Sequence, residues 1–165
     1  MKIKTLLCFV LFAFTLLQAQ NSSPLFFSEY GEGSSNNKYL EIYNSGSETV
    51  SLANYALARS SNGSNGTYES WSDVFPNDAS ILPGGVYVVA HNQADAEILA
   101  VADVTFGSLS NGDDGFALAM GTQSDHVYVD WIGDFGSDPG SGWPVCDDSN
   151  GTLNQTLVRK CMITS

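Results

Sequence analysis

Basic residues are scarce in this chain: six Lys and Arg stand against eighteen Asp and Glu, which gives a formal net charge of −12. Phosphate backbones and anionic lipid surfaces are bound mainly through Lys and Arg, because these side chains displace condensed counterions. We therefore expect no nucleic-acid partner. The acidic balance is compatible with a protein or surface-polymer partner, and it does not exclude a divalent cation.

Histidine and assembled catalytic motifs are also scarce. The two histidines, His91 and His126, lie at the ends of predicted strands, with no metal-ligand spacing between them. No GxSxG elbow is present. Residues 31–38, GEGSSNNK, lack the GK[ST] ending of a phosphate-binding loop. The sequence therefore predicts that the protein is not an enzyme and has no cofactor, unless its acidic loops bind calcium.

Long apolar runs are absent beyond the amino terminus. There, two lysines precede a twelve-residue apolar run at 6–17, and small and polar residues follow it. This order is typical of a secretory signal peptide, and the run is too short to span a bilayer. We expect residues 1–20 to be this peptide, cleaved after Ala19 or Gln20. Residues 21–165 then form one secreted or cell-surface domain, whose formal charge is −14 after two lysines are lost.

Cysteine is sparse as well, with three in the whole chain. Cys8 lies in the predicted signal peptide, so the mature chain keeps Cys146 and Cys161, fifteen positions apart. In an exported protein such a pair more often forms a disulfide than a metal site. A bridge closing a loop of this size would stabilise the fold by about 3 kcal/mol. We predict that Cys146 and Cys161 are bonded.

What the sequence does contain is a β-strand pattern. In 38–44, Leu40 and Ile42 alternate with polar and aromatic residues, which predicts a half-buried strand with these two side chains inward. Only 93–103 has helical composition, so we expect one short helix at most. Many short strands separated by Gly, Asn and Asp turns indicate an all-β sandwich. Strands are expected within 25–30, 38–44, 49–60, 86–92, 111–121, 126–135 and 152–160.

A polar loop at 31–37 separates the first two predicted strands. Its glycines and asparagines suit a turn, so we interpret it as a wide hairpin. Lys38 follows at once and is expected to pair with Glu29 or Glu32 across the hairpin, at an exposed site where such a pair contributes less than about 1 kcal/mol. Lys38 is also a candidate ligand contact.

Carboxylates in glycine-rich loops are candidate metal ligands. Asp113 and Asp114 share a tight turn, and Asp134 and Asp138 lie four residues apart in a second loop. Calcium takes six to eight oxygen ligands, which such loops can supply, although the order of an EF-hand is missing. Aspartates in turns also bond to backbone N–H groups. Both interpretations stay open for these four residues.

Tryptophan and tyrosine offer a further lead. If several lay on one exposed face, they would form a platform on which sugars stack, and a carbohydrate-binding module, calcium-assisted or not, is the alternative function. The strand pattern instead permits Trp131 to lie in the core. Trp143, between Gly142 and Pro144, suits a plug over the sandwich edge and is a candidate ligand contact.

Six stretches in order resemble the lamin tail domain family in its bacterial exported form. They span almost the whole mature chain: FFSEYGEGSSNNKYLEIYN, VSLANYAL, ILPGGVYVVAHNQADAEILAVAD, LSNGDDGFAL, VDWIGDFGSDPGSGW and NQTLVRK. The resemblance implies an immunoglobulin-like β-sandwich without catalytic residues of its own. It also implies a binding or tethering module for protein or cell-surface contacts, of a kind often fused to exported hydrolases, so the chain is either a minimal module or a piece of a larger secreted hydrolase.

Overall fold

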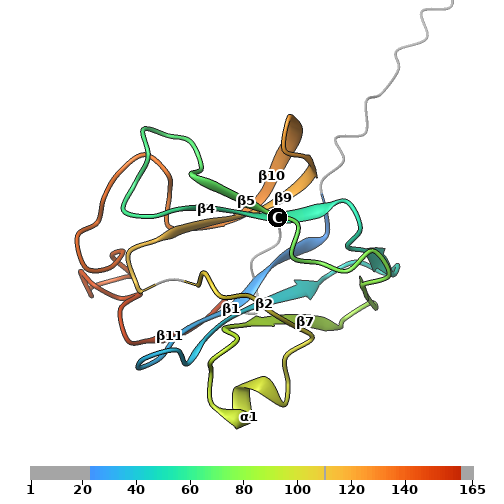
Figure 1. Ribbon diagram of the computed structural model, residues 1–165, viewed down its shortest axis with the longest axis horizontal. Helices are drawn as coiled ribbons and strands as arrows, with labels where there is room; N and C mark the ends of the chain where they lie inside the picture. The colour runs from blue at the N-terminus through green and yellow to red at the C-terminus, as the bar shows by residue number, and fades with distance from the viewer. Residues whose placement is uncertain (1–22, 110, 161–165) are drawn as a thin grey trace, which may run out of the picture.

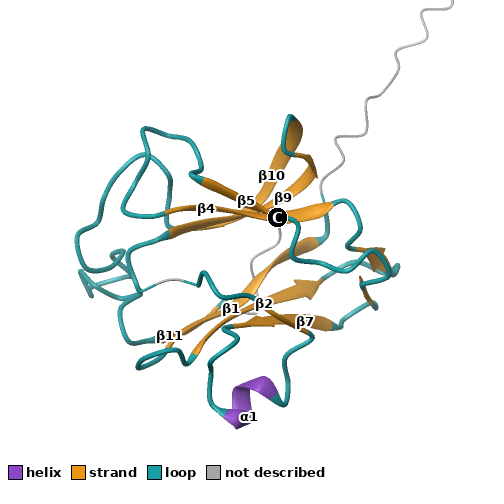
Figure 2. Cartoon of the chain, in the orientation of Figure 1, coloured by secondary structure: helices purple, strands orange, loops and turns teal. Residues whose placement is uncertain are grey.

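Two β-sheets stacked face to face form the protein, in a computed structural model that describes residues 23–109 and 111–160 (Figures 1 and 2). The helix α1 (Ala96–Leu99) lies on the outer side of the lower sheet in Figure 1. The expected all-β, immunoglobulin-like sandwich with one short helix is confirmed.

One sheet has five strands in the order β11-β1-β2-β7-β8. They are β1 (Leu25–Glu32), β2 (Lys38–Asn44), β7 (Val86–Ala90), β8 (Val104–Thr105) and β11 (Thr156–Val158). All neighbours are antiparallel except β7 and β8, which are parallel and are joined through the segment that carries α1. The first and last strands of the described chain are therefore direct neighbours.

The facing sheet has four strands in the order β10-β9-β4-β5. They are β4 (Tyr55–Ser60), β5 (Ser70–Ser72), β9 (Gly115–Thr122) and β10 (Asp125–Ile132). A short ribbon pairs β3 (Val50–Ser51) with β6 (Ser80–Ile81). In β10 the register shifts between Tyr128 and Asp130, which leaves Val129 as a bulge.

The core lies between the two sheets. Leu40 and Ile42 are 1% and 0% exposed, as their alternation in β2 predicted. Leu57, Phe116 and Leu118 meet them from the facing sheet. Burying each such side chain contributes about 1.5–3 kcal/mol relative to leaving it in water.

The polar hairpin loop is held in place from both sides. Asn37 and Asp95 bond reciprocally: the Asn37 amide donates to Asp95 Oδ2 at 2.7 Å, and the Asp95 N–H donates to Asn37 Oδ1 at 2.8 Å. Lys38 pairs with Glu32, whose other carboxylate oxygen accepts the N–H of Asn154. The expected partner is right, but the expected exposed site is wrong: the two side chains are 10% and 4% exposed. They are buried because the chain leading into β11 covers this end, where the Glu32 N–H donates to Gln155 O.

A second ion pair joins the two sheets beside β11. Arg159 donates to Asp130 Oδ2 at 2.6 Å, and the same oxygen accepts the N–H of Phe27 at 2.8 Å. Arg159 Nε donates to the carbonyl of Phe27, and its backbone N–H donates to the carbonyl of Ser28. Arg159 follows the last residue of β11 that pairs with β1, and through these contacts it extends the attachment to the backbone of β1.

Candidate binding site

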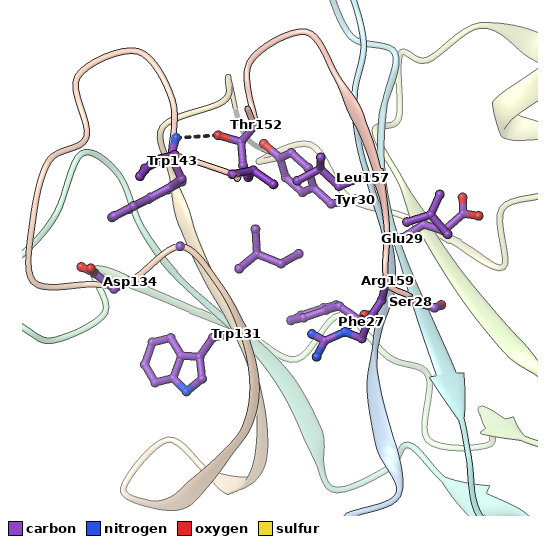
Figure 3. A pocket seen from close by; sticks show the side chains of 15 residues that line it. Phe27, Ser28, Glu29, Tyr30, Trp131, Asp134, Trp143, Thr152, Leu157 and Arg159 are labelled. Carbon is purple, nitrogen blue, oxygen red and sulfur yellow. Dashed lines mark hydrogen bonds between the residues drawn. The ribbon is translucent and has the colours of Figure 1, made fainter. Parts of the chain in front are cut away.

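A cleft of about 400 Å³ opens between β10 and β11, the end strands of the two sheets (Figure 3). Figure 3 shows Phe27, Tyr30 and Leu157 on one side and Trp143 on the other, whereas Trp131 lies on the far side of β10. The charged side chains at the cleft are Glu29, Asp134 and Arg159. Its volume and largely apolar lining are typical of a binding site.

Trp143 is fixed by three contacts. Its backbone N–H donates to Thr152 Oγ1 at 2.6 Å, and its indole N–H donates to the carbonyl of Asp114 at 3.1 Å. Gly133 has φ +66° and lies so close to the indole ring that a Cβ there would collide with it. The half-buried ring therefore covers one end of the sandwich and forms a wall of the cleft.

The four candidate metal ligands are found in different surroundings. Asp114 is buried and pairs with Arg59 at 2.8 Å. Burial raises its pKa above the ordinary value, and the Arg59 charge opposes this rise. Asp113 is also buried, and its Oδ1 has no hydrogen-bond partner among the described residues.

Asp134 and Asp138 bond within their own loop. Asp134 Oδ1 accepts the N–H groups of Gly136 and Ser137, and Asp138 Oδ1 accepts that of Gly140. Over residues 23–109 and 111–160, no three His, Cys, Asp or Glu side chains gather closely enough to hold a metal. The two loops are thus not brought together as one ligand set, and calcium binding stays a prediction.

Six rings touch in sequence over the outer face of the four-stranded sheet. Ring centroids along this aromatic row are 4.5–5.9 Å apart, and the row consists of Tyr68, Trp71, His126, Tyr128, Trp131 and Phe135. Several of these rings cover the small, fully buried Ala58 and Ala117. Trp131 is 38% exposed, so it does not lie in the core, which the strand pattern had permitted. The bulge at Val129 is the reason, because it turns both Tyr128 and Trp131 outward.

The other predicted site residues lie away from the cleft or outside the described chain. Lys38 is engaged by Glu32 and does not line the cleft. Cys146 is exposed, but Cys161 lies outside the described residues, so the disulfide stays a prediction. The predicted signal peptide, 1–20, also lies outside them. His91 is buried, and its Nδ1 accepts the N–H of Gln93, a structural role.

The two facing sheets make this an immunoglobulin-like domain. A family model for the lamin tail domain matches residues 18–134, and the chain belongs to this family. Domains of this family are immunoglobulin-like and often mediate interactions. A search of curated proteins found no match.

The family match ends at Asp134, before Trp143 and β11. Residues beyond the matched span therefore contribute to both sides of the cleft, Leu157 to one and Trp143 to the other. Within the described part of the chain, no helix is long and apolar enough to cross a membrane.

Proposed function

We propose that this chain is an exported, non-catalytic module that binds another protein through the cleft between β10 and β11. The main support for this proposal is the position and the lining of the cleft. It lies where both sheets end, and it is lined mainly by apolar and aromatic side chains. Such a surface gives affinity by burying apolar area, without a reacting group.

The occupant that fits is an extended segment of a partner protein. Among the described strands, β10 has a neighbour, β9, on one edge only, so its other edge offers backbone groups for strand addition. An extended segment can add to such an edge as a further strand while its side chains enter adjacent pockets. The formal charge of −12, or −14 after signal cleavage, favours a segment with Lys or Arg beside its apolar residues.

In this function the domain holds and positions another protein, in the manner of a tether. The partner is either a separate exported protein or a hydrolase of which this chain is a part. The signal-like amino terminus supports export, and family membership supports an interaction role.

The test is a selection of random extended peptides against the purified exported protein, followed by measurement of the affinity of selected peptides for two variants. Val158→Arg changes an exposed residue of the cleft. The control, Val86→Arg, changes an exposed valine of β7, which lies neither in the cleft nor in β10. We expect peptides with an apolar centre and basic flanks. Val158→Arg should weaken the binding of these peptides at least about tenfold through like-charge repulsion, while Val86→Arg should leave it unchanged.

Two results would overturn the proposal. One is peptide binding that both arginine variants affect equally, because the cleft would then not be the site. The other is turnover of ester, phosphodiester or glycoside substrates that persists through repeated purification, because the domain would then be catalytic.

A further inference from the structure

A second cavity, of about 320 Å³, lies at one end of the aromatic row and is distinct from the cleft. It is bordered by the start of β4, by β5 and the loop after it, and by the turn between β9 and β10. Its polar lining contains three amide side chains and one carboxylate: Asn54, Asn77, Gln123 and Asp73. Trp71 supplies the large aromatic surface.

Trp71 is held in a fixed orientation. In β5 it pairs with Ala58, whose small side chain leaves room for the indole on the outer face. The indole N–H donates to Asp73 Oδ1 at 2.9 Å, so ring and carboxylate position each other. The rings of His126 and Tyr68 contact it at centroid distances of 4.8 and 5.6 Å. A ligand would meet a preorganised surface, which lowers the entropic cost of binding.

The chemistry of this lining suits hydroxyl groups. Amide side chains both donate and accept hydrogen bonds, and a carboxylate accepts them. A sugar hydroxyl can donate and accept as well, so it can bond to either kind of group. An aromatic face packs against the apolar C–H face of a sugar ring. Among the described residues, no Lys or Arg lines the cavity, so none of them would neutralise a phosphate, sulfate or uronate there. The lining therefore favours an uncharged, hydroxyl-rich ligand.

We propose that this cavity binds one residue of a neutral carbohydrate chain, packed on Trp71 and hydrogen-bonded by Asn77, Gln123 and Asp73. The adjoining rings of His126, Tyr128 and Trp131 extend the apolar surface along β10 and contact the neighbouring sugar residues. The exported module thus has two separate surfaces, the cleft for a protein segment and this cavity for a surface glycan.

The experiment is calorimetric titration of the exported protein with neutral oligosaccharides built from glucose, mannose, galactose or N-acetylglucosamine. Acidic oligosaccharides of similar length are the comparison. At least one neutral chain should bind. Trp71→Ala should weaken its binding at least about tenfold, as expected for loss of an aromatic anchor.

Because Trp71→Ala also removes packing, the exposed pair Asn77→Ala with Gln123→Ala provides a second test that leaves the fold intact. This double variant should weaken binding to a similar extent. Gln155→Ala, an exposed glutamine outside the cavity, and Val158→Arg in the cleft should leave it unchanged. Three results would overturn the proposal: no neutral chain binding to the folded protein, binding of acidic chains only, or neutral-chain binding that the double variant retains in full.

Discussion

The contribution of the Lys38–Glu32 ion pair to stability depends on its burial. On the surface the pair would matter little, but here both side chains are nearly inaccessible to solvent. Lys38→Met would leave the Glu32 carboxylate buried without its cation, which costs about 3–5 kcal/mol in comparable cases. We expect a fall of that size in the free energy of unfolding, measured by chemical denaturation.

The matched control for this prediction is Lys160→Met, an exposed lysine, for which a change within about 0.5 kcal/mol is expected. The double variant Glu32→Gln with Lys38→Met should recover part of the loss, because no net charge then remains buried. A loss below about 1 kcal/mol for Lys38→Met alone would show that the pair behaves as an exposed one.

Tyr39 carries a second residue-scale prediction. Burial, a hydrogen bond to Glu29 at 2.9 Å and the charge of that carboxylate raise the pKa of Tyr39 to about 12. The folded state therefore favours the neutral phenol. The resulting stability is present below the unfolded pKa of about 10 and is lost as the pH rises toward 12.

The measurement for Tyr39 is absorbance titration of the phenolate, compared with Tyr39→Phe to identify the late component among the seven tyrosines. Glu29→Gln should lower the pKa of Tyr39, since it removes the negative charge, and the exposed Glu48→Gln should not. An unchanged titration in Glu29→Gln would contradict the role of Glu29.

At the scale of elements, β11 depends on more than its three paired residues. Asp130→Ala removes the acceptor of both the Phe27 N–H and the Arg159 guanidinium. Hydrogen bonds to charged groups contribute about 1.5–3 kcal/mol. We therefore expect amide hydrogen exchange at Arg159 and in β11 to accelerate about tenfold to a hundredfold, as measured by NMR or mass spectrometry.

Asp125→Ala is the control for this prediction, because it changes an exposed aspartate in the same strand. Exchange in β11 should be unaffected by it. If Asp130→Ala left the exchange of β11 unchanged while the protein stayed folded, the link between the sheets would not stabilise that strand.

Alternation along the chain was sufficient to predict most strands, because a period of two in a strand such as β2 follows directly from burial on one face. Alternation failed at Trp131, because the bulge at Val129 changes the face of the sheet on which the following side chains lie. No feature of the sequence predicts this extra residue. The helical segment 93–103 forms only the four residues of α1, none of them buried. With no apolar face to bury, its composition alone does not extend the helix.

The cleft and the cavity were harder to predict than the strands. The cleft combines β1 with Trp143 and Leu157, which only the folded chain brings together. The cavity beside Trp71 likewise combines three separate segments. Tryptophan enrichment indicated aromatic recognition, but the partners of each ring depend on strand order, which pairs β5 with β4 and β10 with β9.

For the whole molecule, export is the first expectation to test. Expression of the complete chain in a secreting bacterium should place the protein outside the cytoplasm. Sequencing of its amino terminus should find Gln20 or Asn21 first. Replacing both early lysines, Lys2 and Lys4, by glutamate should retain more of the uncleaved chain inside, because the basic start is part of the signal. Full-length protein in the cytoplasm of the unaltered strain would contradict export.

The predicted bridge between Cys146 and Cys161 also belongs to the whole molecule. Mass spectrometry of the exported protein after alkylation should find neither cysteine alkylated without reduction. Both should be alkylated after reduction. Reduction should lower Tm by several degrees, since about 3 kcal/mol of loop-closure stabilisation corresponds to about 2–4 °C per kcal/mol at this size. Two thiols that alkylate without reductant would contradict the bridge.

The pairing of β1 with β11, the first and last strands of the described residues, has a mechanical consequence. Val158 lies opposite Glu29 and Thr156 opposite Gly31, so the chain enters β1 and leaves β11 on the same side. Tension between these two points would separate the strands one residue pair at a time and not shear them all at once. β11 would then detach first, at low force, and with it the cleft wall formed by Leu157 and Val158. If the cleft holds a partner, as proposed above, that partner would be released by this tension.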